Sequence, residues 1–139
     1  MFHYYQPTKI HFGAGQLNEL GHICRGYGKT CFLVTTPDAP LQPLYERVKK
    51  LLDAEGISVI HFDKVEPNPS VEIVEQGFAM LKEQPADFVL AVGGGSSIDT
   101  AKAIAFANGK ESIDWDHLFN EYSSPFAYYP SYSENTCPC

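Results

Sequence analysis

The sequence predicts an α/β domain with three layers built around a parallel sheet. Three apolar runs predict it, residues 30–36, 57–62 and 87–92, and each is followed by a stretch with helical periodicity. Such runs are typical of strands buried on both faces of a sheet. About 20 to 25 residues separate one run from the next, which suits helical crossovers between parallel strands. The 139 residues make up one domain's length of chain.

The first half of the chain contains two of these strands. Lys9–Gly15 alternates and predicts a short edge strand, and residues 16–23 predict a brief helix. Thr30–Thr36 predicts a buried strand. The helix that follows has Gly56 at its C-terminal stop and a Glu46–Lys50 pair on its exposed side. One apolar face of that helix consists of Leu41, Leu44, Val48 and Leu51.

The second half repeats the pattern. Ile57–Phe62 is β-branched and predicts the second strand, and a loop with two prolines follows it. Ser70 is placed to cap a helix that starts at Val71. Asp87–Val92 predicts the third strand, and a last helix runs to about Asn108. The apolar face of the earlier helix consists of Val71, Val74, Phe78 and Leu81.

Three successive glycines, Gly93–Gly95, join the third strand to the last helix. Ser96 or Ser97 is a candidate N-cap, and Ser96 with Asp99 resembles a capping box. Backbone N–H groups exposed by glycines at a helix N-terminus favour an anion, and a diphosphate fits best. A tight turn with close helix–sheet packing is the alternative. The glycines form neither a P-loop nor G-x-G-x-x-G.

Composition narrows the class of protein. A formal net charge of −7 argues against nucleic-acid binding. No apolar run reaches the roughly 20 residues of a membrane span, and the first residues do not form a signal peptide, so a cytoplasmic protein is expected. The C-x-C of Cys137 and Cys139 is not a zinc or redox motif, and the histidines are scattered, so no metal site is predicted.

Three segments resemble the iron-containing (group III) alcohol dehydrogenase family, which includes butanol dehydrogenases. They read "YYQPTKIHFGAG", "VEPNPSVEIVEQG" and "DFVLAVGGGSSIDTAKAIA". Their order and spacing match the family's N-terminal cofactor-binding domain from about Tyr4 to Phe119. The resemblance implies a three-layer, parallel-sheet, Rossmann-like nucleotide-binding domain over residues 1–122 that binds NAD(P).

Several residues acquire a role from this resemblance. Asp99 would lie near the nicotinamide end of the cleft, and Asn68 would border the adenosine pocket. Both also have a plain reading, Asp99 as a helix-cap residue and Asn68 as a residue that shapes a loop. The pyrophosphate of the cofactor would be bound by Gly93, Gly94, Gly95 and Ser96.

The end of the first strand, Thr35 and Thr36, would face the adenosine ribose, unless these are ordinary strand-end residues. Many NAD-preferring members of the family carry an aspartate at the position of Thr36. This chain has a hydroxyl there and Asp38 two residues later. Because a hydroxyl accepts a 2′-phosphate better than a carboxylate does, the sequence inclines towards NADP(H), with NAD(H) as the alternative.

The family oxidises an alcohol to an aldehyde or ketone, with hydride transfer to NAD(P) and a divalent metal such as Fe²⁺. The metal ligands, an aspartate and three histidines, belong to a second, helical domain whose residues have no match here. We therefore assign no catalytic or metal residue and expect the chain alone to lack catalysis. A non-catalytic nucleotide- or phosphate-binding module is the alternative function. Because members tend to be dimeric, a homodimer or higher self-association is also expected.

The last segment, residues 123–139, does not resemble the family. It is rich in Ser, Tyr and Pro, aperiodic and almost uncharged. We interpret it as an irregular tail, and the hypothesis is a foreign or out-of-frame ending after a truncation.

Overall fold

The computed structural model describes residues 7–116. The chain divides into two compact units, Met1–Asn108 and Gly109–Cys139, and every helix and strand named below belongs to the first unit. The predicted boundary at residue 122 and the tail at 123–139 lie outside the described residues.

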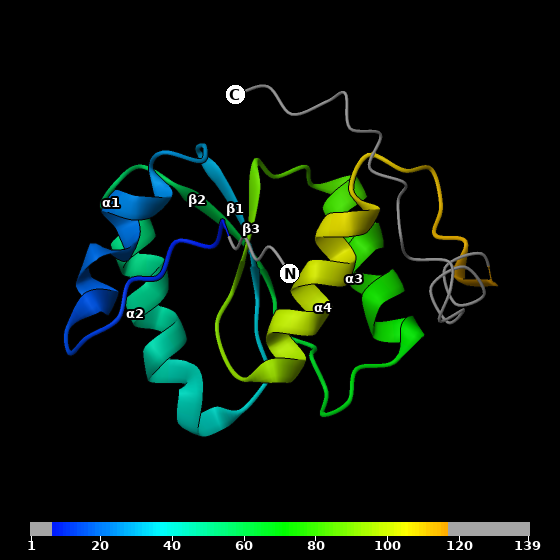
Figure 1. Cartoon of the computed structure of the whole chain (residues 1–139), viewed down its shortest axis with the longest axis horizontal. Helices are drawn as coiled ribbons and strands as arrows, with labels where there is room; N and C mark the ends of the chain where they lie inside the picture. Colours follow the sequence, from blue (N-terminus) through cyan, green and yellow to red (C-terminus); the bar gives the residue numbers. More distant parts are fainter. Residues whose placement is uncertain (1–6, 117–139) are drawn as a thin grey trace, which may run out of the picture. The chain divides into compact units, whose positions relative to one another are not determined.

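A parallel sheet of three strands forms the centre of the first unit (Figure 1). The strands are β1 (Thr30–Val34), β2 (Ser58–Phe62) and β3 (Phe88–Ala91), in the order β2-β1-β3. β1 pairs with both neighbours, and the register places Val34 beside Phe62 on one side and beside Ala91 on the other. The predicted parallel sheet is therefore confirmed.

Helices cover both faces of this sheet, which gives three layers (Figure 1). α1 (Leu20–Cys24), preceded by the 3-10 turn η1 (Gln16–Glu19), packs with α2 (Gln42–Asp53) on one face. The turn η2 (Ala39–Leu41) leads into α2. α3 (Val71–Glu83) and α4 (Gly95–Ala107) pack together on the other face.

The central strand is the centre of the core. Residues 31–35 are fully buried, because the strand has a neighbour on each side and helices above and below. Side chains from α2 and from the start of β2 pack against Cys31 and Leu33. This strand takes the central position because its residues form a continuous apolar run, which can be buried on both faces of the sheet.

Two local predictions are wrong. Lys9–Gly15 forms no strand in the described structure; Ile10 and Phe12 are 78% and 96% exposed, and no neighbouring strand supplies hydrogen bonds. On α2, the buried side chains are Tyr45, Val48 and Leu52. The helix is thus rotated by about one residue from the predicted face, because the large Tyr45 ring turns inward.

The ion pair on the exposed side of α2 also differs from the predicted one. Glu46 pairs with Lys49, at 2.9 Å between Oε1 and Nζ, instead of with Lys50. The carboxyl pKa of Glu46 is lowered, first by this hydrogen bond and then by the charge of Lys49. The other helix boundaries lie close to the predicted ones, and Gly56 has the positive φ of 73° expected after the helix end.

Candidate cofactor cradle at the carboxyl edge of the sheet

The ends of β1 and β3 lie side by side at the carboxyl edge of the sheet. Beyond β3, the N–H of Val92 donates to the carbonyl of Val34 at 3.1 Å, so the pairing continues to the last residue before the glycines. The chain leaves β1 towards β2 on one side, and β3 lies on the other side. Open α/β sheets bind ligands at such a switch point.

Only the first of the three glycines is required by the fold. Gly93 has a φ of +144°, and a Cβ there would lie 2.6 Å from the hydroxyl oxygen of Ser97. Gly94 and Gly95 have no positive φ, and a Cβ on either would meet no atom within 4 Å. The turn therefore explains Gly93, whereas Gly94 and Gly95 border open space that the folded chain does not use.

α4 begins two or three residues earlier than capping by Ser96 or Ser97 would place it. Gly94 is its N-cap and Gly95 its first residue, and no side chain caps the end. Capping by Ser96 or Ser97, and the capping box with Asp99, are therefore wrong. Asp99 instead faces Lys102 at 3.7 Å on the exposed side of the helix. The first-turn N–H groups are left for solvent or a ligand, and the helix dipole favours an anion there.

Ser97 is the second unusual feature of this turn. Its hydroxyl is fully buried and is, within residues 7–116, the side-chain polar atom that is buried with no hydrogen-bond partner. Leaving such a group unpaired costs about 1 to 3 kcal/mol. By contrast, Thr100 on the next turn donates to the Ser96 carbonyl at 2.8 Å. Bare backbone, open space and an unpaired hydroxyl together fit a diphosphate-bearing cofactor.

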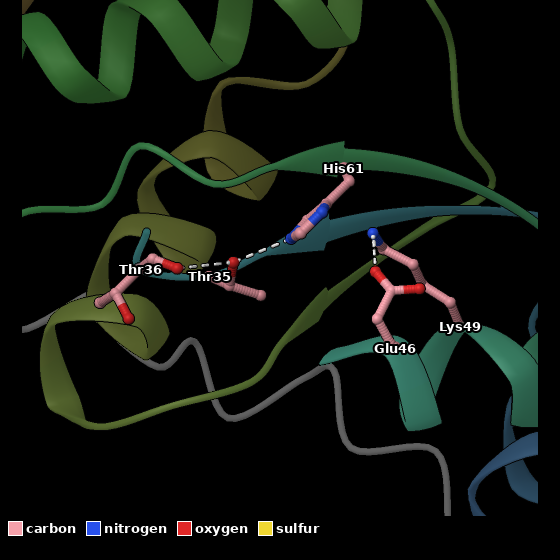
Figure 2. Close-up of polar contacts among 5 residues, drawn as sticks. All are labelled: Thr35, Thr36, Glu46, Lys49 and His61. Atoms are coloured by element: carbon pink, nitrogen blue, oxygen red, sulfur yellow. Dashed lines mark hydrogen bonds and ion pairs between the residues drawn. The ribbon is translucent and has the colours of Figure 1, made fainter. Parts of the chain in front are cut away.

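Thr35 does not present its side chain to this edge. It is fully buried, and its hydroxyl donates to the Thr36 carbonyl at 3.1 Å and meets Nε2 of His61 at 2.8 Å (Figure 2). The prediction that Thr35 faces a ribose therefore needs correction for its side chain. The reason is that side chains alternate along a strand, so Thr35 points to the same face of the sheet as Cys31 and Leu33, the face covered by α2.

Thr36 is half-buried and does lie at the edge. Its hydroxyl donates to Oδ2 of Asp38 at 2.7 Å, and the hydroxyl of Tyr45 lies 2.9 Å away. Tyr45 itself is fully buried, and its ring meets that of His61 edge-on at 6.1 Å. Asp38, just before η2, together with residues from α2 and β2, thus holds the end of β1.

Asn68 lies in the loop between β2 and α3, at the same edge of the sheet. It has a φ of 53°, the left-handed conformation that Asn tolerates better than most residues. It is exposed. The structure thus brings Thr36 and Gly93–Ser96 to neighbouring strand ends, while Asn68 lies in the loop after β2 and Asp99 on the exposed side of α4.

Sequence reasoning did not single out Tyr45, His61 or the isolated hydroxyl of Ser97. The only signal for Tyr45 was that it stands next to Leu44, at the border of the predicted apolar face, and nothing indicated its partner. Within residues 7–116, no group of three or more His, Cys, Asp or Glu side chains could hold a metal ion. The same residues include no helix of the length and apolarity needed to cross a membrane.

The three-layer parallel fold and the glycine turn at its switch point define a Rossmann-like α/β domain. The model of the iron-containing alcohol dehydrogenases matches residues 7–133, and the chain belongs to that family. A probable NADH-dependent butanol dehydrogenase 2 of Bacillus subtilis is 43% identical over 116 residues, which cover 83% of this chain and 30% of that protein. Alcohol dehydrogenase 4 of Saccharomyces cerevisiae is 38% identical over 116 residues, 81% of this chain and 30% of that protein.

Solved structures agree with this assignment. An NADH-dependent butanol dehydrogenase A of Thermotoga maritima superposes with a TM-score of 0.78 at 32% identity, over 88% of this chain and 31% of that one. A 1,3-propanediol oxidoreductase gives a TM-score of 0.76 at 32% identity, over 84% of this chain and 31% of that one. The chain therefore spans about 30% of the length of the curated relatives it matches.

Proposed function

We propose that this chain binds a nicotinamide dinucleotide, with the diphosphate held by Gly93, Gly94, Gly95 and Ser96 at the start of α4. The observation that carries the proposal is the open space over Gly94 and Gly95, where the fold alone would accept a side chain. The unpaired hydroxyl of Ser97 beneath the turn supports it. So do the relatives whose names describe NADH-dependent enzymes.

The remaining residues divide between the two ends of the cofactor. We place Thr36 and Asp38 at the adenosine ribose and Asn68 at the border of the adenosine pocket. Asp99, on the exposed side of α4, would lie towards the nicotinamide end. Thr35 supports this edge from inside, because its hydroxyl holds the Thr36 carbonyl.

We further propose that the chain prefers NAD(H) to NADP(H). The sequence inclined to NADP(H) because Thr36 carries a hydroxyl in place of an aspartate. In the structure that hydroxyl already donates to Asp38, which brings a carboxylate beside the end of β1. A carboxylate accepts hydrogen bonds from ribose hydroxyls and repels a 2′-phosphate, so Asp38 takes over the discriminating role.

For the whole enzyme we propose metal-dependent alcohol oxidation, the activity in its relatives' names. The bound nicotinamide would accept the hydride, and a divalent metal would polarise the alcohol oxygen. This chain's residues would bind and orient the cofactor and keep its diphosphate at the helix N-terminus. In the family, the metal ligands belong to a second, helical domain. We therefore propose that this chain, which spans about 30% of its relatives' length, does not by itself turn over an alcohol.

Titration calorimetry with NAD⁺, NADH and adenosine tests the proposal. Binding of both dinucleotides, with adenosine much weaker, supports a site that recognises the diphosphate. Equal affinity for adenosine and NAD⁺ would contradict it. Adding Zn²⁺ or Fe²⁺ with butanol to the NAD⁺ complex, and following absorbance at 340 nm, tests the expected lack of turnover.

A further inference from the structure

The polar contacts around Thr36 have a fixed direction. The Asp38 carboxylate can only accept a hydrogen bond, so the Thr36 hydroxyl, 2.7 Å from Oδ2, must be the donor. That hydroxyl has one proton, and its oxygen therefore accepts from the Tyr45 hydroxyl at 2.9 Å. The chain of donation runs from Tyr45 to Thr36 to Asp38.

A second chain of donation reaches the same residue from β2. The Thr36 carbonyl accepts from the Thr35 hydroxyl at 3.1 Å, so the Thr35 oxygen accepts the Nε2 proton of His61 at 2.8 Å (Figure 2). Burial, and then the charge of Lys49, lowers the pKa of His61, which agrees with a neutral ring. The backbone and the side chain of Thr36 are thus held from two different elements.

We propose that Tyr45 is a positioning residue for cofactor specificity: its hydroxyl orients Thr36, and Thr36 in turn holds the Asp38 carboxylate for the adenosine ribose. This inference rests on the proposed nicotinamide dinucleotide site. Tyr45 would not touch the cofactor, because it is fully buried. It acts by restricting an exposed carboxylate that would otherwise sample several rotamers.

The geometry predicts which cofactor binds more weakly when Tyr45 is replaced. A positioned Asp38 accepts a hydrogen bond from the 2′-hydroxyl of the adenosine ribose, which is free in NAD⁺ and phosphorylated in NADP⁺. The Thr36 hydroxyl already donates its one proton to Asp38, so it cannot also donate a hydrogen bond to a 2′-phosphate. Loss of the Tyr45 hydroxyl should therefore weaken NAD⁺ binding and leave NADP⁺ binding nearly unchanged or stronger.

The experiment is a comparison of affinity ratios in the full chain by titration calorimetry. We expect the native chain to bind NAD⁺ about tenfold or more tightly than NADP⁺, because one hydrogen bond to a charged group changes affinity by about this factor. Asp38→Asn should reduce the ratio by about tenfold, and Tyr45→Phe by about three- to tenfold. Thr36→Val should match Tyr45→Phe, and Thr36→Ser should retain the native ratio.

The matched control is Tyr27→Phe. Tyr27 is 65% exposed and precedes β1, at the amino edge of the sheet, so the same chemical change there should leave both affinities unaltered. Thermal unfolding of each variant checks that it is folded. If Tyr45→Phe does not fold, Thr36→Val still tests the proposal, because it removes the hydroxyl through which Tyr45 would act on Asp38.

The outcomes separate the two proposals. If neither dinucleotide binds, the proposed function fails and this inference fails with it. If both bind but the native chain shows no preference, or Tyr45→Phe keeps the native ratio while folded, only the role of Tyr45 is refuted.

Discussion

Replacing Gly95 by alanine separates a cofactor site from a simple turn. Gly95 is the first residue of α4, has no positive φ, and a Cβ there would meet no atom within 4 Å. A fold-based account therefore predicts a gain: alanine is about 1 kcal/mol better than glycine in a helix and restricts the unfolded chain. We expect the free energy of unfolding to rise by about 0.5 to 1 kcal/mol, a few degrees in Tm.

Affinity for the cofactor should change in the opposite direction. If the diphosphate lies against the backbone of Gly94 and Gly95, the added methyl group occupies its place and separates its oxygens from the N–H donors. We expect NAD⁺ and NADP⁺ to lose at least about tenfold in affinity, or about 1.4 kcal/mol, with their ratio unchanged. Urea unfolding and titration calorimetry measure the two quantities on the same preparation.

Gly26→Ala is the control for this pair of measurements. Gly26 has no positive φ, and its Cβ would lie 3.6 Å from the Ile23 carbonyl oxygen, an ordinary contact at the opposite edge of the sheet. Its substitution should leave cofactor affinity unaltered. The reasoning is refuted if Gly95→Ala is stabilised and still binds NAD⁺ like the native chain, because the glycine would then have no role in binding.

Three further results are expected. Gly93→Ala should lower the free energy of unfolding by about 2 kcal/mol or more, since the φ of Gly93 is +144° and its Cβ would lie 2.6 Å from the Ser97 hydroxyl oxygen. Adding Ser97→Ala should recover part of this loss in urea unfolding. An equal loss with and without Ser97→Ala would contradict the contact. Burial, and then the charge of Lys49, lowers the pKa of His61 in the folded chain. The unfolded chain therefore binds more protons, and the free energy of unfolding should fall as the pH drops from about 7 to 5. His61→Gln should reduce this dependence on pH in unfolding curves, and an unchanged dependence would rule out His61 as its source. Burial, and then Cys24, raises the pKa of Cys31 to about 12, so iodoacetamide at pH 8 should label Cys31 only after unfolding. If peptide mass spectrometry finds labelled Cys31 in the folded chain, the central strand is accessible to the reagent and the prediction is wrong.

The order and type of most elements could be predicted from local patterns. The run from Cys31 to Val34 has no polar residue to turn towards solvent, so it becomes the central strand. Gly56 follows α2 with the predicted positive φ. Ser70 is the N-cap residue of α3 as predicted, but its side chain makes no capping hydrogen bond. These features depend on neighbours within a few residues, and a sequence displays such neighbours directly.

Predictions that depended on distant partners were less successful. Lys9–Gly15 alternates like a strand, but alternation cannot supply the neighbouring strand, and none pairs with it within residues 7–116. The α2 face was misplaced by about one residue because the Tyr45 ring fills space beside β1 and β2, which the helix sequence does not show.

By itself, the sequence determined a parallel α/β domain with a glycine turn at the carboxyl end of its third strand, and the resemblance to a dehydrogenase family. Only the tertiary structure decided what each glycine does: Gly93 is needed for the turn, whereas Gly94 and Gly95 face open space. Likewise, only packing brought Tyr45 to Thr36, nine residues apart along the chain. The physical reason is that periodicity records which side of an element is apolar, whereas empty space and hydrogen-bond direction arise only when separate elements meet.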